Sequence, residues 1–144
     1  CLQMGIRPTI EAVELVFPMM NIVTIARAFG LIPLGILGSV AEYREKDRFR
    51  LYAGNAKKMG FSGGYCIHPD QVAILNEVFS PSDQEITWAK RVIECFDAAV
   101  SEGRASTSLD GKMVDTPIYK QACSVVEKAD AIRLLEQKKR PRVA

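Results

Sequence analysis

The fold is decided by the stretch Gly60-Phe61-Ser62-Gly63-Gly64-Tyr65-Cys66-Ile67-His68-Pro69-Asp70-Gln71-Val72. Residues 61–67 are expected to form a short strand, because they lie between a glycine that ends one helical pattern and a proline that begins the next. His68-Pro69 opens that next helix, since proline fits the first helical position well. A strand that passes directly into a helix is half of a β/α unit, so this stretch predicts an α/β fold.

The preceding residues repeat this alternation. Residues 31–38 are almost wholly apolar, and glycines bound the run at both ends. This pattern is typical of a strand buried on both faces in a parallel sheet. Residues 43–59 have the spacing of a helix. Residues 9–29 also carry apolar side chains at helical spacing, although Pro18 is expected to interrupt or kink that helix before Gly30 ends it. Helices and strands that alternate with short connections predict a parallel α/β sheet, not a helical bundle.

The second half of the chain has a different organisation. Ser82 and Glu85 are spaced as a capping box and predict the start of a long helix. The expected apolar stripe of this helix is Trp88, Val92, Cys95, Phe96 and Ala99. Residues 104–115 are polar and aperiodic and therefore predict a loop, after which Thr116-Pro117 begins another helix. Two helices joined by such a loop indicate an appended helical module.

The composition is that of a soluble globular protein. Its 144 residues are 48% hydrophobic and 25% charged, and 19 basic against 17 acidic residues leave a net charge of +2. This near balance argues against a nucleic acid or an anionic membrane as the main partner. No apolar run approaches the roughly 18 residues that indicate a membrane span. The four scattered cysteines, with one histidine, favour reduced thiols over a metal site, so we expect a cytoplasmic protein.

Two motifs resemble those of a known enzyme family. The stretch quoted above, continued by Leu75-Asn76-Glu77-Val78-Phe79-Ser80-Pro81-Ser82, is similar to the C-terminal signature of the citrate lyase beta-subunit and malyl- or citramalyl-CoA lyase family. This family is part of the HpcH/HpaI aldolase/citrate lyase superfamily. Its second signature is matched, in the same order, by Asp110-Gly111-Lys112-Met113-Val114-Asp115-Thr116-Pro117. The resemblance covers about residues 9–132, with Gly64 where many members carry lysine.

The resemblance implies a (β/α)₈ TIM barrel, an architecture that typically needs about 250 residues. The chain is therefore expected to supply only the C-terminal part of a barrel. Residues 1–80 would contain its last two strands, at 31–37 and 61–67, with their helices. Residues 81–144 would form a helical C-terminal extension with a lid loop at 104–115.

The activity that the resemblance implies is a magnesium-dependent, reversible carbon–carbon cleavage. A 3-hydroxyacyl-CoA thioester, such as citryl-, malyl- or citramalyl-CoA, is split into an acyl-CoA and a 2-oxo acid. The carboxylates that bind Mg²⁺ in the family belong to earlier strands, so we assign no metal ligand in this chain. The resemblance also implies a homo-oligomer, a trimer or hexamer, in which the lid reaches a neighbouring subunit.

Two functions of other classes stay open at this point. The chain could be a non-catalytic subunit or assembly element of a lyase complex. It could also be a small independent binding domain that uses the basic tail at residues 138–142. The sequence upstream of the first residue would separate a lyase from a silent relative, because a lyase requires an acidic pair and an arginine there.

The candidate catalytic residue is Asp115, which matches the lid motif of the family. The resemblance implies that this aspartate is the acid/base group that exchanges a proton with the substrate. An acidic residue just before a Thr-Pro helix start is otherwise most often a helix cap or a solvated side chain. Asp110, in the same loop, is the weaker rival and is expected to form a turn before Gly111.

The candidate CoA-binding residues are Ile67, His68 and Pro69, which lie at the expected carboxyl end of a barrel strand. Ligand-binding groups concentrate at that end of a TIM barrel. His68 is open to two interpretations: a general base, or a cap that holds the turn between strand and helix. The structural interpretation is favoured, and the backbone of the three residues is expected to line the CoA or acyl pocket.

Overall fold

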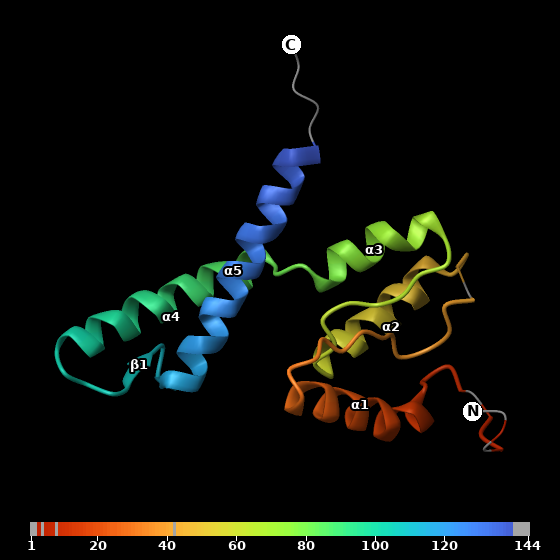
Figure 1. Ribbon diagram of the computed structural model, residues 1–144, viewed down its shortest axis with the longest axis horizontal. Coiled ribbons are helices and arrows are strands. Elements are labelled where there is room, and N and C mark those ends of the chain that lie inside the picture. Colours follow the sequence, from red (N-terminus) through yellow and green to blue (C-terminus); the bar gives the residue numbers. More distant parts are fainter. Residues whose placement is uncertain (1–2, 4, 8, 42, 140–144) are drawn as a thin grey trace, which may run out of the picture. The chain divides into compact units, whose positions relative to one another are not determined.

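The computed structural model describes residues 3, 5–7, 9–41 and 43–139, and the chain divides into two compact units, Cys1–Phe79 and Ser80–Ala144 (Figure 1). The first unit contains the 3-10 helix η2 (Val13–Leu15) and the helices α1 (Val16–Ala28), α2 (Lys46–Lys58) and α3 (Pro69–Phe79). The second unit contains α4 (Asp83–Ser101), the strands β1 (Thr107–Leu109) and β2 (Lys112–Val114), and α5 (Thr116–Lys139). The fold is a mostly helical α/β fold with one small sheet. In the described ranges, no helix has the length and apolar character needed to cross a membrane.

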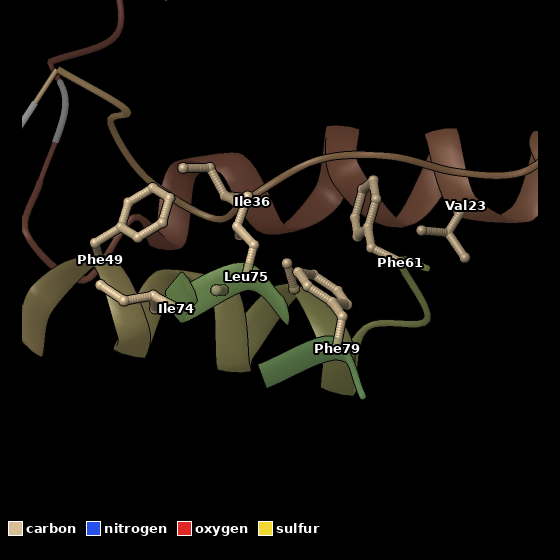
Figure 2. Packing of buried hydrophobic residues seen from close by; sticks show 9 residues of the cluster. Val23, Ile36, Phe49, Phe61, Ile74, Leu75 and Phe79 are labelled. Atoms are coloured by element: carbon tan, nitrogen blue, oxygen red, sulfur yellow. The ribbon is translucent and has the colours of Figure 1, made fainter. Parts of the chain in front are cut away.

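The core of the first unit is one cluster of apolar side chains (Figure 2). Side chains from all three helices and from the two extended segments near residues 36 and 61 point toward one another in it. Its buried members are Val23, Ile36, Phe49, Ala53, Ala56, Phe61, Ile74, Leu75 and Phe79. Burial of these apolar surfaces is the main source of stability for this unit.

Helices α2 and α3 are joined by two exposed ion pairs. Lys46, in the first turn of α2, lies 2.8 Å from Asp70, in the first turn of α3. One turn further along α2, Arg50 donates two hydrogen bonds, of 3.0 and 3.3 Å, to Glu77. The two helices therefore begin at the same end of the unit, as successive helices of β/α repeats do.

The two predicted strands are extended segments that do not form a regular sheet. Residues 31–37 and 61–67 meet at a single parallel bridge, between Leu34 and Gly63, with two backbone hydrogen bonds of 2.9 Å. The prediction of two full strands is therefore wrong for this chain. A pair of short parallel segments is marginal without further strands beside it, because sheets gain stability from several neighbours.

The first of these segments is also less buried than its apolar composition predicts. Leu31 and Ile32 are 61% and 72% exposed. Pro33 is buried but has no N–H group to donate to a neighbouring strand. The prediction of a strand buried on both faces is thus wrong within the described residues, although Ile36 and Leu37 at the end of the segment are buried.

Gly64 lies where the two extended segments pack closely. A Cβ atom at this position would be 2.7 Å from Cγ2 of Ile36 and 3.3 Å from the carbonyl oxygen of Gly35. The Cγ2 methyl is attached to a stiff, β-branched carbon, so it has little room to move. The side chain of Ile36 therefore occupies the space that any larger residue at position 64 would need.

Gly64→Ala is expected to lower the free energy of unfolding by about 1–3 kcal/mol, because it overpacks this contact. Thermal unfolding followed by circular dichroism measures the effect. Ile36→Leu removes the branched methyl at nearly constant volume, so the double variant should lose less than the sum of the two single losses. The control is Gly54→Ala, on α2, where the added Cβ atom would meet no neighbouring side chain or segment within 4 Å. Helix propensity predicts that this control gains about 0.5–1 kcal/mol. Additive losses at positions 36 and 64 would contradict this account.

The first helix is shorter than its sequence pattern predicts. It begins at Val16, not near residue 9, after the 3-10 turn of η2. Pro18 therefore lies in the first turn of α1, where the backbone N–H groups have no partner within the helix. Proline is tolerated at such a position, so α1 runs from Val16 to Ala28 without interruption at Pro18. The predicted start of α3 at Pro69 is confirmed.

The second unit packs α4 against α5 and the small sheet. The predicted capping box is present: Oγ of Ser82 accepts from Glu85 N–H, and the Glu85 carboxylate accepts from Ser82 N–H. The buried cluster of this unit is Ala89, Val92, Phe96, Val114 and Ala122. Trp88, predicted to lie on the apolar stripe, is 39% exposed, and Ala89 next to it takes the buried position.

The predicted loop at 104–115 contains a β-hairpin. Strands β1 and β2 pair in antiparallel register, with Leu109 opposite Lys112. Asp110 and Gly111 have φ angles of 52° and 75°, the left-handed conformations that a two-residue turn between strands requires. Three-residue strands are too short to show a period, which is why the sequence indicates an irregular loop here. The turn that was predicted at Asp110 is confirmed.

Candidate functional site

The candidate residues Ile67, His68 and Pro69 connect the second extended segment to α3, and a buried glutamine holds this connection. Gln71 is 1% exposed. Its Oε1 accepts from the N–H of Ile67 at 2.9 Å and from the N–H of His68 at 3.2 Å. Its Nε2 donates to the carbonyl oxygen of Val40 at 2.9 Å. One side chain thus ties the ends of both extended segments together.

His68 caps the start of α3. Its Nδ1 accepts a hydrogen bond of 3.3 Å from the N–H of Asp70, and its carbonyl oxygen accepts one of 3.0 Å from the N–H of Gln71. The ring of Tyr43 stacks on the imidazole, with 4.7 Å between ring centroids and 20° between the planes. This geometry agrees with the structural interpretation of His68, and one imidazole nitrogen is already used by the cap.

Opposite charges surround the same helix start. Lys46 hydrogen-bonds to Asp70 and, by this contact and its charge, lowers the pKa of that carboxyl. The carboxylate of Asp70 also lies in the first turn of α3, where the helix dipole favours a negative charge. Asp70 is therefore ionised at neutral pH, and it serves the pairing of α2 with α3.

A shallow depression lies beside Tyr43. Its volume is about 560 Å³, and it is lined by Ala41, Tyr43, Arg44, Glu45 and Arg48. Tyr43 is shared between this depression and the stack on His68, and the guanidinium carbon of Arg44 is 5.5 Å from the centroid of the same ring. Tyr43 therefore links this depression to the candidate CoA-binding residue His68.

Asp115 lies in the second unit and caps α5. Its Oδ1 accepts from the N–H of Ile118 at 3.2 Å, and its carbonyl oxygen accepts from the N–H of Tyr119 at 2.9 Å. The side chain is half-buried, next to the buried Val114 that ends β2. The helix cap, which was the plainer interpretation of this residue, is present. A cap uses one carboxylate oxygen, so it does not exclude proton transfer at the other.

The hairpin that leads to Asp115 is fastened to α4. Arg91 donates two hydrogen bonds, of 2.8 and 2.9 Å, to the two carboxylate oxygens of Asp110. This contact lowers the pKa of Asp110. One turn further along α4, Sγ of Cys95 lies 3.7 Å from the carbonyl oxygen of Ser108. The segment before Asp115 is therefore an ordered hairpin held against a helix.

Residues that could hold a metal ion are not clustered in the described ranges. No group of three or more histidine, cysteine, aspartate or glutamate side chains there is placed to bind a cation. The assignment of the magnesium ligands to earlier barrel strands stays a prediction.

Sequence reasoning missed the roles of Gln71, Tyr43 and Arg91. Gln71 lies within the motif at residues 60–72. The signal was available, because Gln71 shares one helical face with Ile74 and Leu75, both buried. A polar residue within such an apolar stripe must find hydrogen-bond partners. The partners of Tyr43 and Arg91 are distant in sequence, and no local pattern indicates them.

Three curated proteins are similar to this chain over most of its length. Citramalyl-CoA lyase, mitochondrial, from Rattus norvegicus is 32% identical over 120 residues, which are 83% of this chain and 35% of the relative. L-malyl-CoA/beta-methylmalyl-CoA lyase from Cereibacter sphaeroides is 35% identical over 111 residues, 77% of this chain and 34% of the relative. Citrate lyase subunit beta from Escherichia coli is 33% identical over 127 residues, which are 88% of this chain and 41% of the relative. No family model matches the chain.

A solved structure gives the same result. The crystal structure of CitE from Mycobacterium tuberculosis, in complex with magnesium, acetoacetate and coenzyme A, superposes with a TM-score of 0.64 at 28% identity. The similarity covers 78% of this chain and 40% of that one. This chain therefore spans about two-fifths or less of the length of the relatives that it matches.

These relatives define a class of protein, the lyases that act on CoA esters. Within that class, the chain is homologous to part of the citrate lyase beta-subunit and malyl- or citramalyl-CoA lyase family. The resemblance that the two sequence motifs indicate is thereby confirmed.

Proposed function

We propose that this chain is the C-terminal part of an acyl-CoA lyase that cleaves a 3-hydroxyacyl-CoA reversibly into an acyl-CoA and a 2-oxo acid. The observation that carries this proposal is the similarity, over about four-fifths of the chain, to proteins named as lyases of CoA esters. The solved relative that binds coenzyme A and magnesium supports it. The substrate class is a citryl-, malyl- or citramalyl-CoA thioester.

The first unit, in this proposal, is the end of a (β/α)₈ barrel. Two features support that role. The extended segments meet in parallel, at Leu34 and Gly63, and the helices beside them begin at the same end. The apolar Leu31 and Ile32 are exposed, as expected for strand residues whose neighbours belong to another part of the protein. The second unit would be the C-terminal extension, with the hairpin as its lid.

Asp115 would exchange the proton that the reaction requires. When the carbon–carbon bond of the substrate breaks, the hydroxyl passes its proton to the carboxylate of Asp115, the 2-oxo acid forms, and the electron pair of the broken bond passes to an enolate of the thioester. An acid must then protonate the enolate carbon to give the acyl-CoA. In the reverse direction, the same group in its basic form removes that proton. The fixed cap at Oδ1 of Asp115 leaves the second carboxylate oxygen to carry the proton.

The remaining parts of the site would come from other chain segments. Magnesium, when bound, would polarise the oxygens of the 2-oxo acid portion as a Lewis acid. Its ligands would belong to earlier barrel strands, because the described residues hold no suitable cluster. Ile67, His68 and Pro69 would contact the CoA thioester. We further propose a trimer or hexamer, with Asp115 placed over the site of a neighbouring subunit. A cytoplasmic location stays a prediction from the sequence.

Turnover of the full-length protein tests this function. Purified protein is incubated with magnesium and, separately, citryl-, malyl- and citramalyl-CoA, and the released acyl-CoA is measured by chromatography. Cleavage of at least one thioester is expected. Absence of cleavage of all three, by a folded protein that binds coenzyme A, would favour the alternative of a non-catalytic subunit or assembly element.

His68→Asn is expected to leave turnover of the full-length enzyme within about tenfold of the original, a change of roughly 1.4 kcal/mol in the barrier. Asparagine can keep a cap on α3, since its side-chain oxygen accepts from the backbone as Nδ1 of His68 does now. Steady-state kinetics and thermal unfolding are measured together. A loss of several orders of magnitude at unchanged stability would show that His68 is catalytic.

A further inference from the structure

Gln71 is the single polar or charged residue that is buried in the described part of the chain. Its amide makes three hydrogen bonds, two as acceptor and one as donor. A buried amide without partners is strongly unfavourable, so this side chain restricts the backbone groups around it to a narrow geometry. The burial and the three bonds together make Gln71 a fixed point in the first unit.

The three bonds join two segments that are distant in sequence. Val40 follows the first extended segment, whereas Ile67 and His68 end the second. Further back, the same segments are joined by their own backbones at the bridge between Leu34 and Gly63. The backbones of the two segments pair at this one bridge. The amide of Gln71 joins the same two segments a second time, at their carboxyl ends.

The three bonds also decide which groups of residues 67–70 are available to contact a ligand. The N–H groups of Ile67 and His68 are both taken by Gln71, and the N–H of Asp70 is taken by Nδ1 of His68. The side chain of Ile67 is 64% exposed and that of Pro69 is exposed as well. A ligand would therefore contact side chains whose positions Gln71 sets through the backbone.

We propose that Gln71 is a positioning residue for the binding of the CoA thioester. Its amide holds Ile67-His68-Pro69 against the segment at Val40. This placement gives the three residues their affinity for the thioester. The inference rests on the proposed function, because it takes these residues as the CoA contact. Gln71 itself is buried and does not touch the substrate.

Gln71→Met tests this proposal, because methionine keeps the length of the side chain and removes all three bonds. Gln71→Glu is a milder variant, since its carboxylate still accepts from Ile67 and His68 but cannot donate to Val40 when ionised. The matched control is Ile74→Ala, one turn further on the buried face of α3, which lowers stability without changing any of the three bonds.

The first measurement is backbone amide hydrogen exchange of the 144-residue chain. The N–H groups of Ile67 and His68 are expected to exchange about tenfold faster, or more, in Gln71→Met, the effect of one well-formed hydrogen bond. Comparison with Ile74→Ala corrects for the general loss of stability. Unchanged exchange at both positions would overturn the proposal without any reference to activity.

The second measurement is the affinity of the full-length protein for free coenzyme A, by calorimetry at a temperature where every variant is folded. Gln71→Met is expected to weaken binding by about tenfold or more and Gln71→Glu by less, with Ile74→Ala unchanged. In turnover, KM for the thioester should rise while kcat stays within about threefold. Unchanged affinity in Gln71→Met, or an equal loss in Ile74→Ala, would reduce Gln71 to a purely structural role and overturn the proposal.

The two measurements separate this proposal from the proposed function. If the unsubstituted full-length protein fails to bind coenzyme A, the proposed function fails and the role of Gln71 in CoA binding fails with it. The exchange measurement would still report whether Gln71 holds the two segments. If the unsubstituted protein binds coenzyme A and the Gln71 variants bind it equally well, only the inference about Gln71 fails.

Discussion

Replacing Asp115 by asparagine is expected to lower the turnover of the full-length enzyme by roughly 10²–10⁴-fold, the usual contribution of a positioned general acid or base. The fold should survive, because asparagine caps a helix as well as aspartate does and can still accept from the N–H of Ile118. The KM for the thioester should change little. Steady-state kinetics and thermal unfolding of the variant measure these effects.

Asp110→Asn is the matched control for this experiment. It removes the same charge from the same hairpin, and asparagine tolerates the left-handed φ of 52° at that position. The variant loses the charge of its ion pair with Arg91 but keeps Asp115, so turnover should fall by less than about fivefold. Near-normal activity of Asp115→Asn, or an equal loss in both variants, would dismiss Asp115 as the acid/base group.

A mixing experiment tests whether Asp115 acts on a neighbouring subunit. Asp115→Asn subunits are combined with subunits disabled at a magnesium-binding carboxylate of the upstream part. If sites are shared between subunits, some mixed oligomers contain one intact site and activity reappears. Native mass spectrometry first confirms that mixed oligomers form. Mixed oligomers that stay inactive would show that Asp115 acts within its own subunit or not at all.

The 144-residue chain on its own is expected to show no lyase turnover and to associate with itself. It spans about a third of the citramalyl-CoA lyase that it resembles, and its described residues contain no cluster for magnesium. The first unit also carries many exposed apolar side chains, on α1 and on the segment that follows it. They include Phe17, Ile22, Ile25, Phe29, Leu31 and Ile32, each more than half exposed.

Sedimentation measures the association, because a monomer has a mass of 15.9 kDa. Exposed apolar patches of this kind favour contact with another chain. The double variant Phe17→Gln, Phe29→Gln should reduce the associated fraction, since both side chains are 77% exposed and neither is part of the core. Val100→Gln, in the second unit, is the control and should leave association unchanged. A monomeric chain, or one that cleaves a 3-hydroxyacyl-CoA unaided, would contradict this prediction.

The features that could be predicted from the sequence are those set by neighbouring residues. Pro69 fixes the start of α3, Ser82 and Glu85 form the predicted capping box, and Asp110 forms the predicted turn. Each depends on groups within a few residues, so a local pattern is sufficient. Asp115 is also local: its place before Thr116-Pro117 predicts the cap that the structure contains.

The features that could not be predicted depend on distant partners. The strands expected at 31–37 and 61–67 require neighbours on both sides, and within the described residues each segment has only the other, at one bridge. The hairpin strands are too short to show a period. The ion pair between Arg91 and Asp110 joins residues from two separate elements. Of these features, only the role of Gln71 is indicated in the sequence, because a polar residue there shares a helical face with apolar ones.

The hairpin is attached to its unit in two chemically different ways. Its tip is held by the exposed pair of Arg91 and Asp110, whereas its base is held by the buried Val114 and the cap at Asp115. Dissolved ions screen exposed charges, over about 8 Å at physiological ionic strength, but have little effect on buried apolar contacts. Rising salt concentration is therefore expected to weaken the attachment of the tip more than that of the base. Ionic strength is thus expected to change the mobility of the turn at Asp110 more than the position of Asp115.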